Sequence, residues 1–214
     1  MFEIVICIIT AFFITYVTIP LVLVLSRRYS ISDDKRNSNV APPFGGIAIF
    51  LGIVSSLIFW TKTGFTQDII TILSALFIIF LLGVIDDLIR LSPLKKLFGQ
   101  IIAIVFVIYY NDLRITSMQG IGLMYDLPIV ASYALTIFTI IVITNAFNLI
   151  DGIDGLAATI GIIVSVCFML FFLFNNDSRF VLISAAVIGS LGAFLRYNYQ
   201  PALIYMGDTG SLAL

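Results

Sequence analysis

Long runs of apolar residues, separated by short polar segments, fill almost the whole chain and limit its fold more than any other feature. A helix needs roughly 20 such residues to cross the hydrocarbon core of a bilayer. Because 61% of the residues are hydrophobic and only 11% are charged, a water-soluble fold could not bury this much apolar surface. Hydropathy predicts spans near Phe2–Leu25, Phe44–Trp60, Ile69–Ile85, Leu97–Tyr110, Ile129–Phe147, Leu156–Phe174 and Phe180–Tyr197.

The predicted fold class is therefore all-α integral membrane: a polytopic helical bundle with about seven spans plus the start of an eighth. Residues 1–214 are expected to form a single transmembrane domain. Cys7 and Cys167 lie inside apolar runs and are read as packing residues. The net charge of -1 gives no reason to expect a nucleic-acid partner.

The basic residues predict how the spans are oriented. If the loops alternate between two sides, most of the 11 Lys and Arg residues fall on one side, and the positive-inside rule makes that side cytoplasmic. The N-terminus is then expected outside. The cytoplasmic set is Arg27, Arg28, Lys35, Arg36, Arg90, Lys95, Lys96 and Arg196, and the outer set is Lys62, Arg114 and Arg179.

One predicted outer segment, from Asn111 to Leu127, alternates polar with apolar residues around Gly120 and Gly122. This pattern is typical of a short β-hairpin. An irregular loop is the alternative.

Five aspartates lie on the predicted cytoplasmic side beside strongly apolar sequence: Asp86, Asp87, Asp151, Asp154 and Asp208. An ionisable residue at membrane depth costs about 2.5–3.5 kcal/mol on insertion scales, so such residues usually line a polar cavity and serve a function. Gathered carboxylates also repel one another unless a cation or shared protons relieve them. We therefore expect all five to converge on one cytoplasm-facing cleft, the alternative being that each merely caps a helix at the interface.

Local sequence refines this expectation for two of the acidic segments. Asp86 and Asp87 follow an apolar run at a predicted helix C-terminus, where the helix dipole disfavours anions, so capping is the weaker interpretation there. In a helix, Asn148, Asp151 and Asp154 would recur at i, i+3 and i+6 and share part of one face. The alternative is a polar turn between two spans.

Asp208 stands between Gly207 and the pair Thr209-Gly210, at the mouth of the last apolar stretch. A single carboxylate at such a place suits Mg²⁺, which takes few protein ligands and completes its shell with water and phosphate. An N-cap of the following helix is the alternative role. Nearby bases are candidates for holding phosphates, although the positive-inside bias alone would also place them there: Lys35, Arg36, Lys95 and Lys96.

Three segments together resemble the signature regions of the polyprenyl-phosphate N-acetylhexosamine-1-phosphate transferases (the MraY/WecA family, glycosyltransferase 4 type). They are Asp86-Asp87, the run from Asn145 to Leu156, and the run from Asn198 to Ser211. The resemblance implies that Asp208 binds Mg²⁺, with Mn²⁺ as the alternative ion, and that Asp86 and Asp87 are catalytic near the lipid phosphate. It implies that the nucleotide and phosphate pocket is lined by Lys96, Asn148, Asp151, Asp154 and Asn198.

The implied reaction transfers a HexNAc-1-phosphate from a UDP-N-acetylhexosamine to polyprenyl (undecaprenyl) phosphate and releases UMP, the first membrane step of cell-envelope polysaccharide synthesis. The wording NLIDGIDGL is similar to the WecA-like branch. The alternatives are the transferase of UDP-MurNAc-pentapeptide in peptidoglycan synthesis and an ion-coupled membrane transporter. The implied location is the bacterial cytoplasmic membrane, with the site facing the cytoplasm and with a homodimer as an open alternative to a single subunit.

Two departures from the family pattern qualify these expectations. The first cytoplasmic loop has Lys35-Arg36-Asn37 where family members often have Lys-x-His. Family members also continue past the GDTGS segment and carry a histidine-bearing loop, whereas this sequence has no histidine. We therefore expect an N-terminal fragment of a longer enzyme, inactive on its own.

Overall fold

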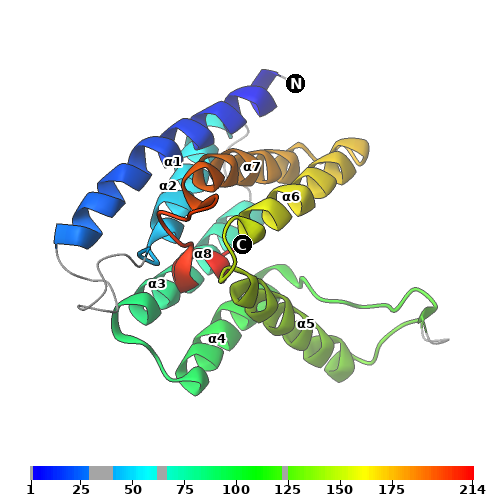
Figure 1. Cartoon of the computed structure of the whole chain (residues 1–214). Coiled ribbons are helices and arrows are strands. Elements are labelled where there is room, and N and C mark those ends of the chain that lie inside the picture. The colour runs from blue at the N-terminus through cyan, green and yellow to red at the C-terminus, as the bar shows by residue number, and fades with distance from the viewer. Residues whose placement is uncertain (1, 29–40, 62–66, 122–124) are drawn as a thin grey trace.

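The structure, a computed structural model, describes residues 2–28, 41–61, 67–121 and 125–214. Several residues used above lie outside these ranges, among them Lys35, Arg36, Asn37, Lys62 and Gly122. Within them the chain forms eight helices (Figure 1). Their bounds are α1 Phe2–Arg28, α2 Gly45–Trp60, α3 Gln67–Ile89, α4 Pro93–Asn111, α5 Ile129–Ile150, α6 Leu156–Phe174, α7 Ser178–Asn198 and α8 Gly207–Ser211.

Six of these helices, α1 and α3 to α7, are long and apolar enough to cross a membrane. The chain is thus a multi-pass helical membrane protein, as predicted. The exception is α2, whose 16 residues extend only about 24 Å at 1.5 Å per residue, somewhat less than the hydrocarbon core. What the sequence indicated as the start of an eighth span is α8, a helix of 5 residues.

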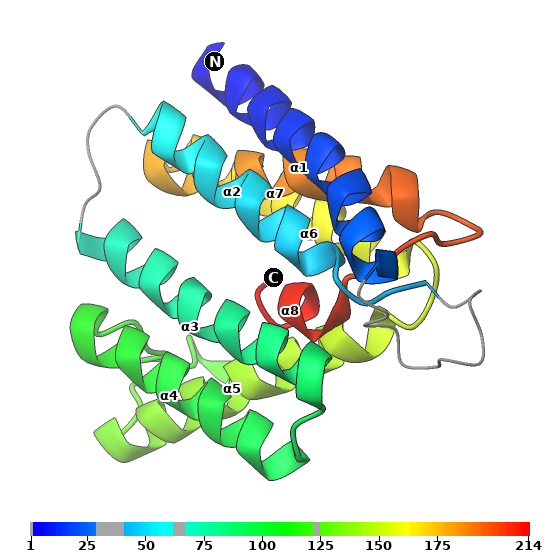
Figure 2. The same cartoon turned by 90° about the vertical axis from the view of Figure 1, so that its left-hand side faces the viewer.

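The helices form two groups with α8 between them, as both views show (Figures 1 and 2). In the first group α7 packs against α1, α2 and α6. In the second, α3 packs against α4, and α4 against α5. Because α8 contacts α2, α3 and α5, this short helix joins the two groups at the centre of the molecule.

Small residues allow the first group to pack closely. The buried face of α7 includes Ser184, Ala185, Gly189 and Ala193. A Cβ on Gly189 would collide with the carbonyl oxygen of Ile8 in α1, so the two backbones touch here. Such small faces are what membrane helices use, because lipid supplies no hydrophobic force between them. As a result 56% of the residues in the apolar window of α7 are buried, against 11% for α5.

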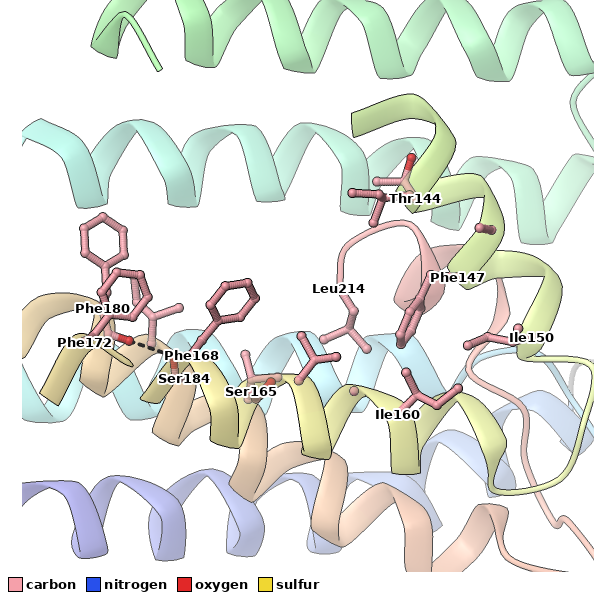
Figure 3. Close-up of a pocket in the computed structure, with 16 residues that line it drawn as sticks. Thr144, Phe147, Ile150, Ile160, Ser165, Phe168, Phe172, Phe180, Ser184 and Leu214 are labelled. Carbon is pink, nitrogen blue, oxygen red and sulfur yellow. Dashed lines mark hydrogen bonds between the residues drawn. The ribbon is translucent and has the colours of Figure 1, made fainter. Parts of the chain in front are cut away.

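An apolar cavity of about 650 Å³ separates α5 from α6 and α7. Figure 3 shows Phe147 of α5, Phe168 of α6 and Leu214, which follows α8, facing this space. Two of the hydroxyl groups in the lining are used within their own helices: Thr144 donates to Ile140 O, and Ser184 to Phe180 O. This cavity is therefore unsuited to a charged nucleotide, and the polar chemistry lies elsewhere.

The segment between α4 and α5 is closer to the irregular loop that was the alternative than to the β-hairpin predicted for it. Ser117 and Asp126 form an isolated antiparallel bridge, supported by Met118 N to Tyr125 O at 2.8 Å. No strand occurs in the described parts of this segment, residues 112–121 and 125–128. Ser132 of α5 donates to Ile115 O at 2.6 Å, which ties the loop to the start of that helix.

Candidate active site

The site is built around α8, whose first turn holds Asp208. The helix begins at Gly207, so its N-cap residue is Met206 and Asp208 lies one residue inside the helix. The alternative of an N-cap role for Asp208 is therefore wrong. Gly207 has φ +71°, and a Cβ there would collide with the carbonyl oxygen of Pro43, so this entry into α8 requires glycine.

The Asp208 carboxylate is held from two other helices. Lys96 Nζ, from the first turn of α4, contacts Oδ2, and Asn148 Nδ2, near the end of α5, contacts Oδ1. Lys96 Nζ also lies 3.3 Å from Oδ2 of Asp86, so its ammonium bridges two carboxylates. Burial raises the pKa of Asp208, but hydrogen bonds with Asp86, Lys96 and Asn148 outweigh this and leave that pKa below its ordinary value.

Asp87, in the last turn of α3, accepts the free donors at the start of α8. Its Oδ1 takes the N–H of Asp208 at 2.9 Å, and its Oδ2 takes the N–H and the hydroxyl of Thr209 at 3.0 and 2.5 Å. The first N–H groups of a helix have no partner within the helix. Asp87 thus caps α8 although it lies 121 positions before Asp208 in the sequence. A Cβ on Gly83, one turn earlier in α3, would collide with Thr209, so α3 and α8 pack in close contact.

The segment after α5 is a turn, and the interpretation of Asn148, Asp151 and Asp154 as one helical face is wrong. α5 ends at Ile150, and residues 151–155 form turns and a bend. The Asp151 carboxylate accepts the N–H of Gly207 at 2.9 Å and that of Met206 at 3.4 Å. Burial is the main reason that the pKa of Asp151 rises to about 7, against the effect of these hydrogen bonds.

Asp154 and Asn198 fix the backbone that leads into α8. Asp154 accepts the N–H of Ala202 at 3.0 Å and the hydroxyl of Tyr205 at 2.9 Å. The hydrogen bond from the Tyr205 hydroxyl raises the pKa of Tyr205. Asn198 is 1% exposed, accepts the N–H of Gly155 and donates to Ile204 O, both at 2.9 Å. These two residues connect the turn after α5 with the segment before α8, and their predicted contact with substrate stays a prediction.

The residues singled out in the sequence thus gather around a single segment, 198–211. Lys96 and Asn148 contact the Asp208 side chain, and Asp86 joins them through Lys96. The other predicted residues hold the backbone of this segment. Lys95 does not belong to the cluster, because its side chain is exposed.

Sequence reasoning gave no individual role to several residues that complete the site, although Asn145, Thr209 and Ser211 lie in the segments that it singled out. Thr209 gives Asp87 two hydrogen bonds, and Ser211 receives one from Asn148 at 2.6 Å. Gln100 and Asn145 hydrogen-bond to each other within the spans of α4 and α5. A signal existed for this pair, since each is a carboxamide in an apolar run, one helical turn from Lys96 or Asn148.

The donor set around Asp208 fits a hard divalent cation. Among the described residues no group of three or more His, Cys, Asp or Glu side chains is arranged to hold a metal alone. Mg²⁺ does not require one, because it is commonly bound by one or two carboxylates, with water and substrate phosphates as its other ligands. The Lys96 ammonium already places a positive charge between Asp86 and Asp208, so a cation at this point matches the local charge.

The fold and the site define a polytopic membrane protein with a half-buried acidic centre where helix ends meet around α8. Residues 69–214 match the model of the family Glycosyl transferase family 4. The chain belongs to this family, as the sequence resemblance indicated.

Individual relatives agree with the family match. The chain is 35% identical, over 97% of its length and 60% of the relative's, to a probable undecaprenyl-phosphate N-acetylglucosaminyl 1-phosphate transferase of Bacillus subtilis (strain 168). It is 34% identical, over 98% of its length and 71% of the relative's, to a phospho-N-acetylmuramoyl-pentapeptide-transferase of Oceanobacillus iheyensis. A transferase of the latter name in Bacillus subtilis is 31% identical over 97% of the chain.

Proposed function

We propose that this chain forms the acidic site of an enzyme that transfers a HexNAc-1-phosphate from a UDP-sugar to polyprenyl phosphate and releases UMP. The relative with 35% identity is named for transfer of N-acetylglucosaminyl 1-phosphate to undecaprenyl phosphate, which supports this branch of the family. The substrates are thus a UDP-N-acetylhexosamine from water and a polyprenyl phosphate from the bilayer.

The observation that carries the proposal is that side chains from different helices bind Asp208 together. Lys96 from α4 and Asn148 from α5 reach the same carboxylate, while Asp87 from α3 fixes the helix that bears it. Phosphoryl transfer depends on positioning and on neutralising charge rather than on covalent chemistry by the protein. Residues from three helices, α3, α4 and α5, that converge on Asp208 match this requirement.

Each side chain has a proposed task. Asp208 and its neighbours would hold Mg²⁺, which supplies charge neutralisation on the sugar-nucleotide pyrophosphate when bound. Lys96, freed from Asp208, offers its ammonium to phosphate oxygens. Asp86 is the better candidate to meet the lipid phosphate, because its Oδ1 accepts the N–H of Leu91 while its Oδ2 faces the Lys96 ammonium, whereas both oxygens of Asp87 hold α8.

The site is proposed to face the bacterial cytoplasm, where UDP-sugars are available. Arg90, Lys95, Lys96 and Arg196 lie at the same helix ends as the aspartates, in accordance with the positive-inside rule. Clustering at one end argues against the transporter alternative, whose ionisable residues are expected near the bilayer midplane.

A second donor is favoured by a specific finding. The relative from Oceanobacillus iheyensis is named a phospho-N-acetylmuramoyl-pentapeptide-transferase and is almost as similar as the first relative, at 34% identity. UDP-MurNAc-pentapeptide is therefore the second candidate donor for the same site and the same chemistry.

The direct test is UMP release by the full-length protein in detergent with polyprenyl phosphate and Mg²⁺, using a panel of UDP-N-acetylhexosamines and UDP-MurNAc-pentapeptide. We expect release with one or more UDP-HexNAc donors and no release when the lipid phosphate is omitted. Release with UDP-MurNAc-pentapeptide alone would move the chain to the second candidate. No lipid-dependent release with any donor would contradict both.

A further inference from the structure

A hydrogen bond between two carboxamides links α4 to α5 within the membrane spans. Asn145 Nδ2 donates to Gln100 Oε1 at 3.1 Å and also to Ile141 O at 2.8 Å in its own helix. Gln100 is only 2% exposed. Side-chain amides in an apolar span are unfavourable unless they serve packing or function.

The link lies directly beneath the site. Gln100 follows Lys96 by four residues in α4, and Asn145 precedes Asn148 by three residues in α5, so each amide is one helical turn deeper on the same face. Lys96 and Asn148 both hold the Asp208 side chain. The spacing of α4 and α5 at this level therefore sets how both of them reach Asp208.

The link is poorly suited to a purely stabilising role. Gln100 Nε2 is buried and has no hydrogen-bond partner among the described residues. A buried donor without a partner is destabilising, and an apolar side chain of the same shape avoids that penalty. A carboxamide here is thus better explained by its effect on the neighbouring site than by its effect on packing.

We propose that Gln100 and Asn145 are positioning residues, whose hydrogen bond fixes the α4–α5 spacing so that Lys96 and Asn148 hold Asp208 in its cation-binding geometry. The inference rests on the proposed function in one respect, that Asp208 binds Mg²⁺. Neither residue contacts the reacting groups. Partners behind metal ligands of this kind typically change metal affinity by about 10–100-fold when removed.

The test uses the near-isosteric variants Gln100→Met and Asn145→Leu, their double variant, and a titration of melting temperature with MgCl₂ in the full-length protein. We expect each single variant to fold with a melting temperature near that of the parent and to need about tenfold more Mg²⁺ for half-maximal stabilisation. The double variant should match the single variants, because the two side chains act as one unit.

The exchanged pair Gln100→Asn with Asn145→Gln keeps both amides and serves as a second variant, expected to restore part of the Mg²⁺ response. Ser190→Ala is the matched control, because Ser190 is also buried and its hydroxyl has no partner in the described part of the chain, but it lies in α7, on the other side of α8. Its Mg²⁺ midpoint should equal that of the parent.

Unchanged midpoints in the single variants, or single effects that add in the double variant, would overturn the positioning role. A parent protein without any response to Mg²⁺ would overturn it together with the metal role of Asp208. A normal Mg²⁺ titration without UMP release would contradict the proposed function and leave the positioning role supported by its own variants.

Discussion

The aspartates at the two ends of the helix bundle are held in opposite ways. At the end away from the site, Asp112 pairs with Arg114 at 2.6 Å and Asp177 with Arg179 at 3.1 Å, each with a partner two residues along the chain. At the site, Asp87 and Asp151 are held mainly by backbone N–H groups more than 50 residues away.

Charged groups at the surface cost little free energy and pair with neighbours in sequence, whereas the buried charged groups of the site depend on partners that the fold brings near. Arg179 lowers the pKa of Asp177 through a hydrogen bond at the surface, whereas burial raises the pKa of Asp151 to about 7. Surface ion pairs contribute little to stability, typically below about 1 kcal/mol. Carboxylates that are buried at the site must be retained for another reason, and the proposed phosphotransfer provides it.

The largest expected contrast is in sidedness. Single cysteines at Lys95 and Arg179, in a background with Cys7→Ser and Cys167→Ser, should react with an impermeant maleimide from opposite faces of the membrane. We expect Lys95→Cys to be labelled from the cytoplasmic face only and Arg179→Cys from the outer face only. Labelling of both from the same face would break the comparison between the two ends.

Asp208→Asn should have the largest effect on activity. It removes the charge that a hard cation requires but keeps the size of the side chain. Since loss of partners behind a metal ligand already costs about 10–100-fold, loss of the proposed ligand should reduce Mg²⁺-dependent UMP release by at least about 100-fold. The matched control is Asp177→Asn, which should release UMP at the parent rate. Near-parent release by Asp208→Asn would move the metal to another carboxylate.

Asp87→Ala should act on stability as well as on activity. It leaves the N–H groups of Asp208 and Thr209 without their acceptor, which costs about 1–3 kcal/mol for a buried group. The melting temperature in detergent should therefore fall, and fall less for Asp87→Asn, which retains one acceptor oxygen. Equal melting temperatures for Asp87→Ala and the parent would show that this carboxylate does not hold α8.

Asp177→Asn should have the smallest effect. The Arg179 hydrogen bond lowers the pKa of Asp177 from its ordinary 3.8, so its contribution to stability is present above about pH 4 and is lost as the pH falls through the lowered folded value. Because the pair is open to solvent, we expect less than about 1 kcal/mol at neutral pH. Parallel melting curves at pH 7 and pH 3 would measure it, and a larger loss at pH 7 would remove the distinction between the two ends.

The spans and the acidic segments could be predicted from sequence because each is a local signal. Apolar runs reveal helices directly, and aspartates beside them are conspicuous. The turn at residues 151–155 was less accessible, because Asp151 and Asp154 are held by Gly207 and Tyr205, partners that only the folded chain brings near. The short α8 likewise depends on Asp87, which no local pattern connects to it.

The central claim is that Asp208 binds the cation of a phosphotransfer site, and the most direct measurement is anomalous diffraction from the full-length protein crystallised with Mn²⁺ and UDP. The account predicts an anomalous peak at coordination distance from the Asp208 carboxylate, with Lys96 moved off that carboxylate and Asp87 still bound to the start of α8. A peak elsewhere, with Lys96 and Asn148 still holding Asp208, would contradict it.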